Sequence, residues 1–229
     1  MNSLTIISLI SFAPAIFLLY VILGEYEGYF KDNKALFMVI LGLGIGMIIG
    51  FFSVLFELSD FLWVVLLVFL IELIKMVILL QKPFRLNHDT TFYGMGLGIG
   101  IGAMFVFTNI YLSGVTAISI ESVSFVLLFS INYTFINSAT GAVMGYGSYQ
   151  GEFWKYLFRA FIIHGIHGFL MSLVWGIFTT SSFSITAMYA LLIIGVVYNV
   201  FLMFYVYNVI FDKTIPKEMK KVKKKASDT

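Results

Sequence analysis

The chain contains no cysteine and very few charged residues. None of its 229 residues is Cys, so a disulfide framework, a Cys-ligated zinc and an iron–sulfur cluster are all excluded. Charged side chains make up 11% of the chain, whereas a soluble domain carries about 25% because water must wet its surface. Apolar residues reach 60%. The composition argues against a soluble fold, a disordered chain and a nucleic-acid-binding surface, and it indicates that the lipid bilayer is the main partner.

Long apolar stretches recur along the whole chain. A helix needs about 20 apolar residues to cross a hydrocarbon core ~30 Å thick. The sequence therefore predicts an all-α, polytopic membrane protein with seven transmembrane helices. These run over Leu4–Leu23, Ala35–Phe56, Phe61–Leu80, Thr91–Ser113, Ser122–Tyr146, Trp154–Phe178 and Ser184–Phe211. We interpret the first stretch as a membrane helix and not as a signal peptide, because no basic segment precedes it.

Lysine and arginine lie on alternate connectors. Of the 14 basic residues, 13 lie beside the connectors after the first, third and fifth predicted helices or in the C-terminal tail. Because basic loops stay on the cytoplasmic side, we expect the N-terminus outside and the C-terminus in the cytoplasm. We expect residues 1–212 to form one transmembrane domain and residues 213–229 to form a basic tail near anionic headgroups.

The fourteenth basic residue, Lys75, lies inside the third predicted helix together with Glu72. A charge in the middle of a membrane costs ~3 kcal/mol on insertion scales, so it needs a partner. A spacing of three places both side chains on one helical face, and Glu72 lies roughly 16 Å along the axis from Phe61. The pair either neutralises itself and holds the helix in the bundle, or belongs to a functional site.

Further polar residues lie inside other predicted helices. His164 and His167 are three residues apart on the sixth, with His164 at a depth similar to that of Glu72. The fifth helix carries a polar stripe at spacings of three and four. Its members are Ser130, Tyr133, Thr134, Asn137, Thr140 and Gly141. Asn109 lies near the outer end of the fourth. Because such residues face protein or water and not lipid, we expect a buried polar network. Its predicted members are Glu72, Lys75, Asn109, Asn137, His164 and His167.

Two helices carry glycines at intervals of four. One set is Gly94, Gly98 and Gly102, and the other is Gly42, Gly46 and Gly50. A dinucleotide-binding loop would need a strand before the glycines, but these lie inside apolar helices. The pattern therefore predicts ridges that let helix backbones approach closely.

In their order along the chain, five segments resemble the PrsW-type intramembrane metalloproteases. That family is grouped with the CAAX-processing proteases and with the anterior-pharynx-defective scaffold subunit of gamma-secretase. The resemblance covers residues 5–175 and is carried by Phe12–Ala15, Phe69–Lys75, Phe107–Asn109, Asn137–Gly145 and His164–Gly168. It implies a membrane-embedded site to which Glu72, Lys75, Asn109 and His164 contribute.

The chain also departs from that family at positions that carry its chemistry. Ile71 stands where the resemblance places the water-activating glutamate, and Asn137 stands where it places a histidine. Where the resembled proteases have a glutamate just before the asparagine that matches Asn109, this chain has Phe107 or Thr108. Gly168 stands where they have an Asn or Asp. The resemblance places two adjacent glutamates at positions 71 and 72, of which only Glu72 is present here, and the scaffold subunit of gamma-secretase similarly keeps one glutamate of that pair.

These departures favour a non-hydrolytic scaffold or partner-binding subunit without a cofactor. Its partner would be another membrane protein, a protease subunit being one candidate. The first alternative is an active metalloprotease, with Glu72 and His164 as catalytic residues and zinc bound by Glu72, His164 and His167. The second is a transporter that uses the same polar cavity. Whether the chain is an enzyme is left open, and the resemblance implies a prokaryotic plasma membrane.

Overall fold

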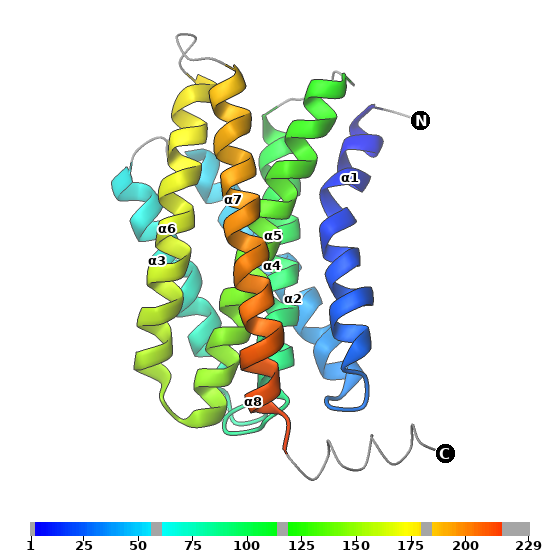
Figure 1. Cartoon of the computed structure of the whole chain (residues 1–229), viewed down its shortest axis with the longest axis vertical. Helices are drawn as coiled ribbons and strands as arrows, with labels where there is room; N and C mark the ends of the chain where they lie inside the picture. Colours follow the sequence, from blue (N-terminus) through cyan, green and yellow to red (C-terminus); the bar gives the residue numbers. More distant parts are fainter. Residues whose placement is uncertain (1–2, 56–60, 114–118, 180–184, 217–229) are drawn as a thin grey trace.

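The computed structural model describes residues 3–55, 61–113, 119–179 and 185–216, and within these ranges the chain forms helices and turns but no strand. The helices run roughly along one common axis (Figure 1). They are α1 (Ser3–Phe17), the π-helical segment η1 (Leu18–Leu23), α2 (Asp32–Leu55), α3 (Phe61–Leu79), α4 (Thr90–Leu112), α5 (Ile120–Gln150), α6 (Phe153–Thr179), α7 (Ile185–Tyr205), the π-helical segment η2 (Val206–Phe211) and α8 (Asp212–Thr214).

Six helices are long and apolar enough to cross a membrane. They are α2, α3, α4, α5, α6 and the continuous helix from α7 through α8. The prediction of an all-helical, polytopic integral membrane protein is therefore confirmed. The first predicted span forms α1 and η1, whose apolar part, Leu9–Leu23, is shorter than the other six. Phe56 and Ser184, each at one end of a predicted span, lie outside the described residues.

Helix α5 is longer than the predicted Ser122–Tyr146, because its ends are set by local caps and not by hydropathy. Ser119 and Ser122 form a capping box in which each side chain bonds the other's backbone N–H, which satisfies free amides of the first turn. The helix ends at Gly151, whose φ of 74° lies in the left-handed region that glycine adopts without steric cost.

The basic connectors meet at one end of the helices. Lys34, after η1, donates a hydrogen bond of 3.2 Å to the backbone oxygen of Pro83, after α3. The Arg85 guanidinium lies 5.1 Å from the ring centre of Phe153, at the start of α6. These segments and α8 lie at the bottom of Figure 1, and α1 begins at the opposite end. The tail residues 217–229 lie outside the described part of the chain.

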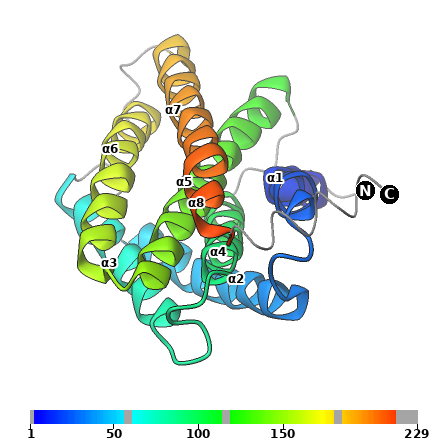
Figure 2. The same cartoon turned by 60° about the horizontal axis from the view of Figure 1, so that its bottom comes forward.

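Helix α4 lies at the centre of the molecule, between α2 on one side and α5 on the other (Figure 2). Its alternating glycines form two ridges on opposite faces. Cβ atoms at Gly94, Gly98 and Gly102 would meet the α5 backbone within 2.5 Å, and one at Gly100 would meet the α2 backbone at 2.2 Å. Gly42 makes the reciprocal approach from α2. The predicted close packing of helix backbones is therefore present.

Candidate functional site: a buried ion pair and an adjoining cavity

The charged residues of α3 lie on the face of that helix that packs inside the molecule. Its buried positions recur every three or four residues and include Val64, Val68, Ile71, Glu72 and Lys75. Glu72 and Lys75 are both 0% exposed. This placement follows from the cost of putting a charge into lipid, which turns both side chains towards the neighbouring helices.

Glu72 and Lys75 form an ion pair that also binds α5. The Lys75 Nζ lies 2.8 Å from the Glu72 Oε1 and donates to the Thr140 Oγ1 at 2.7 Å and to the Asn137 backbone oxygen at 3.3 Å. The Thr140 hydroxyl lies 2.9 Å from the Glu72 Oε1, which accepts its hydrogen bond. The ammonium and carboxylate are thus each bonded to the other and to the same hydroxyl.

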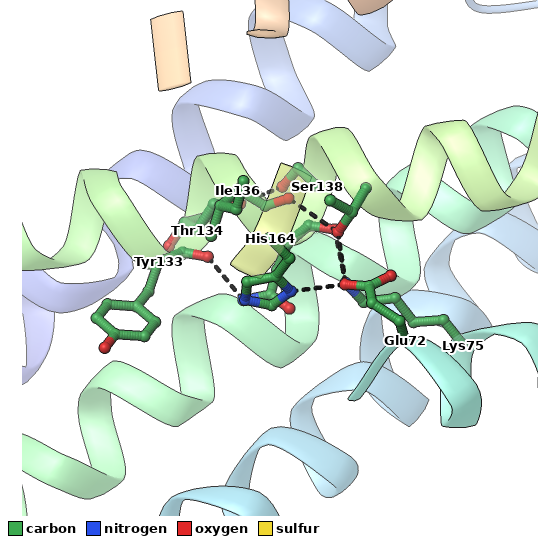
Figure 3. A network of polar contacts seen from close by, with 9 residues as sticks. Glu72, Lys75, Tyr133, Thr134, Ile136, Ser138 and His164 are labelled. Carbon is green, nitrogen blue, oxygen red and sulfur yellow. Dashed lines mark hydrogen bonds and ion pairs between the residues drawn. The ribbon is translucent and has the colours of Figure 1, made fainter. Parts of the chain in front are cut away.

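His164 on α6 completes the group. Its Nδ1 lies 2.6 Å from the Glu72 Oε1, and its side chain is buried. Figure 3 shows Glu72, Lys75 and His164 turned towards one another. One carboxylate oxygen therefore joins α3, α5 and α6. We call Glu72, Lys75, Thr140 and His164 the ion-pair cluster.

The structure brings together only part of the predicted polar network. Glu72, Lys75 and His164 meet as expected, whereas Asn137 joins them only through its backbone oxygen. The Asn137 side chain donates to the backbone oxygen of Tyr133 on its own helix at 2.9 Å.

The prediction that Asn109 belongs to this network is wrong. Its Oδ1 accepts a 3.1 Å hydrogen bond from the Ser53 hydroxyl of α2, and its Nδ2 donates to the backbone oxygen of Phe105. The reason is rotational position, because Asn109 lies on the side of α4 that faces α2. Ser53 was missed, since a single serine in an apolar helix has no distinctive spacing.

His167, also predicted to belong to the network, has no direct bond to the ion-pair cluster among the described residues, although it lines the same cavity as Asn137 and His164. Its ring is fully buried and stands edge-on to Tyr133, with ring centres 5.2 Å apart. The ring centre of His164 lies 6.1 Å away, and neither His167 nitrogen has a hydrogen-bond partner among the described residues.

The role of two further buried polar residues was not recognised from the sequence. Thr140 was seen only as a member of the α5 stripe, yet it is central to the ion-pair cluster. Asn199 on α7 was missed entirely; its Nδ2 donates to the backbone oxygen and Oδ1 of Asn132 at 3.1 and 3.0 Å. The sequence feature that could have identified Asn199 is that it is an isolated amide side chain in an apolar helix. Such a side chain needs a hydrogen-bond partner when it is buried in a helix bundle.

A small cavity adjoins the ion-pair cluster between α3, α5 and α6. About 20 Å³ is available in it to the centre of a water-sized group. The residues that line it are Val64, Leu67, Val68, Ile71, Phe105, Tyr133, Asn137, His164, His167, Gly168, Ser172 and Trp175. Ile71 therefore presents hydrocarbon to a space that Asn137, His164 and His167 also border.

The described residues include no group of three or more His, Cys, Asp or Glu side chains placed to hold a metal ion. Glu72 and His164 bond each other directly, while His167 faces the Tyr133 ring. In chemical terms the arrangement neutralises a charge pair and ties three helices together.

No protein-family model, no curated protein and no solved structure proved similar to this chain.

Proposed function

We propose that the protein spans the membrane seven times, with its N-terminus outside and its C-terminus in the cytoplasm. Helix α1 has 15 residues and η1 continues it for 6, which gives about 31 Å at 1.5 Å per residue. That length matches a hydrocarbon core of ~30 Å. The basic connectors at one end support the orientation, because such connectors stay in the cytoplasm. Residence in a prokaryotic plasma membrane stays a prediction from the resemblance.

Single cysteines can test this topology, because the chain has none of its own. Ile120, 85% exposed at the start of α5, and Lys82, exposed after α3, lie at opposite ends of the helices. In intact cells a membrane-impermeant maleimide is expected to label Ile120→Cys and not Lys82→Cys, and both should react after lysis. The cysteine-free parent is the background control. Labelling of Lys82→Cys alone in intact cells would contradict the orientation.

We infer that the protein is a non-hydrolytic scaffold that binds another membrane protein. The observation that carries this is the bonding of the Glu72 Oε1 to Lys75, Thr140 and His164 at once, which ties this oxygen to helix packing; the Oε2 has no partner among the described residues. Hydrolysis needs a general base within reach of a water molecule. At the neighbouring position, Ile71 borders the cavity with a side chain that cannot accept a proton.

The positions singled out by the resemblance support this proposal. Ile71, Asn137 and His164 stand where the resembled proteases carry a glutamate and two histidines, and all three line one cavity here. The arrangement therefore corresponds to a protease-like site in which two of the three reactive groups are replaced. A protein with such a site keeps the helix packing but lacks the groups needed for hydrolysis, as a scaffold subunit does.

Two measurements on the protein from its own membranes test the scaffold proposal. Photo-reactive residues at Phe52, Ile162 and Phe201, which are exposed on α2, α6 and α7, should yield one discrete cross-linked membrane protein from at least one face. Metal analysis should find no stoichiometric zinc. Absence of adducts from every face would contradict the scaffold. Zinc at one per chain, lost in Glu72→Ala and His164→Ala, would instead establish the metalloprotease alternative.

A further inference from the structure

The cavity beside the ion-pair cluster is lined by both polar and apolar side chains. Asn137 from α5 and His167 from α6 border it from different helices, and both are at least 99% buried. Val64, Val68 and Ile71 from α3 supply an apolar wall. The space of about 20 Å³ is enough for one water-sized group, for which roughly 10–15 Å³ suffices.

Three buried polar atoms of residues that line this cavity have no hydrogen-bond partner among the described residues. Among the described residues, no protein group bonds the Asn137 Oδ1 or either ring nitrogen of His167. By contrast, the Asn137 Nδ2 is bonded to its own helix. Leaving a buried donor or acceptor unsatisfied costs its full desolvation penalty. Three unsatisfied atoms on residues that line one small cavity therefore favour the binding of a group that forms hydrogen bonds there.

The chemistry of these atoms defines what fits. The Asn137 Oδ1 can only accept a hydrogen bond, and a neutral imidazole has one donor and one acceptor nitrogen. No carboxylate or ammonium lines the cavity, so a charged guest would have no counter-ion at membrane depth. The group that fits is small and neutral, donates to Asn137, and exchanges a second hydrogen bond with His167.

We propose that Asn137 and His167 form a binding site for one hydroxyl group, supplied either by water or by a small alcohol. The hydroxyl hydrogen bonds the Asn137 Oδ1, and the hydroxyl oxygen accepts from the protonated ring nitrogen of His167. The site lies in the cavity that His164 of the ion-pair cluster also lines, and the binding of a hydroxyl group there can be tested whether or not the protein is a scaffold.

Solid-state NMR of the full chain in lipid bilayers, with ¹⁵N-labelled histidine, tests the proposal. The chain has three histidines, and His167→Phe identifies the His167 signals by their loss. Magnetisation transfer from water protons to the His167 ring is expected in the parent chain. If water gives none, ¹³C-methanol is expected to show a cross-peak to this ring instead. Absence of transfer from both probes would overturn the site.

Asn137→Leu is expected to abolish the transfer to His167. The matched control is Asn208→Leu, because Asn208 makes the same kind of bond to its own helix, from its Nδ2 to the Phe204 oxygen at 2.9 Å, but lies on η2. The His164 signal, set by its bond to Glu72, reports whether each variant is folded. Unchanged transfer in a folded Asn137→Leu would also overturn the proposal. If Asn137→Leu does not fold, Asn137→Val, which also lacks the acceptor oxygen, replaces it with the same expected loss.

Discussion

Replacing Gly98 with alanine is expected to destabilise the protein strongly, because α4 and α5 could no longer pack at their present separation. A Cβ atom at Gly98 would lie 2.0 Å from the Asn137 backbone oxygen and 2.8 Å from the Ser138 Cα. These are backbone atoms, which cannot move aside as a flexible side chain would. Overpacking a well-packed interior costs about 1–3 kcal/mol and occasionally more, and we expect Gly98→Ala to reach the upper part of that range.

The matched control for Gly98→Ala is Gly44→Ala. A Cβ atom at Gly44, also inside a membrane helix, would meet nothing within 4 Å. Its melting temperature in detergent should be unchanged or slightly raised, since alanine is about 1 kcal/mol better than glycine in a helix. The expected result is therefore a large difference between the two variants. Equal melting temperatures would contradict the close packing of α4 on α5.

Breaking the buried ion pair is expected to have the second large effect. Glu72→Gln leaves the Lys75 ammonium without a counter-ion, and Lys75→Met removes the cation that balances Glu72. Removing one partner of a buried pair typically costs about 3–5 kcal/mol, because the remaining charge is uncompensated. His164→Ala should also lower stability, since it removes a hydrogen bond to the carboxylate. The measurement is the unfolding free energy or melting temperature in detergent.

The double variant Glu72→Gln/Lys75→Met separates charge from packing. It is neutral, and replacing both partners of a buried pair is often close to neutral in stability, so it should recover much of the loss. Lys155→Met is the matched control. Lys155 and Glu152 have the same spacing and lie 2.6 Å apart, but both are about half exposed. Exposed pairs contribute about 0–1 kcal/mol. A stabilising role for the ion-pair cluster would be contradicted if Glu72→Gln and Lys75→Met lowered the unfolding free energy no more than Lys155→Met does.

The sequence predicted part of the candidate site because some of its contacts are local. Glu72 and Lys75 belong to one helix turn, so their spacing alone brings them together. The depth of His164 could be counted from the start of its helix. The contacts of the other predicted network members depend on rotation about a helix axis, which the sequence does not give. Asn109 faces α2, and His167 faces the cavity without a direct bond to Glu72. Two residues can lie at the same depth and still point to different neighbours.

The amino-acid sequence by itself determined that the chain is an apolar, helical membrane protein, where its long helices lie, and that α3 carries two opposite charges on one helical face. These properties depend on composition and on spacing within one helix. Only the tertiary structure decided that Thr140 and His164 complete the ion-pair cluster and that Asn137 and His167 border the adjoining cavity. The physical reason is that these residues come from α3, α5 and α6, and which of their faces meet depends on packing between helices that are far apart in the chain.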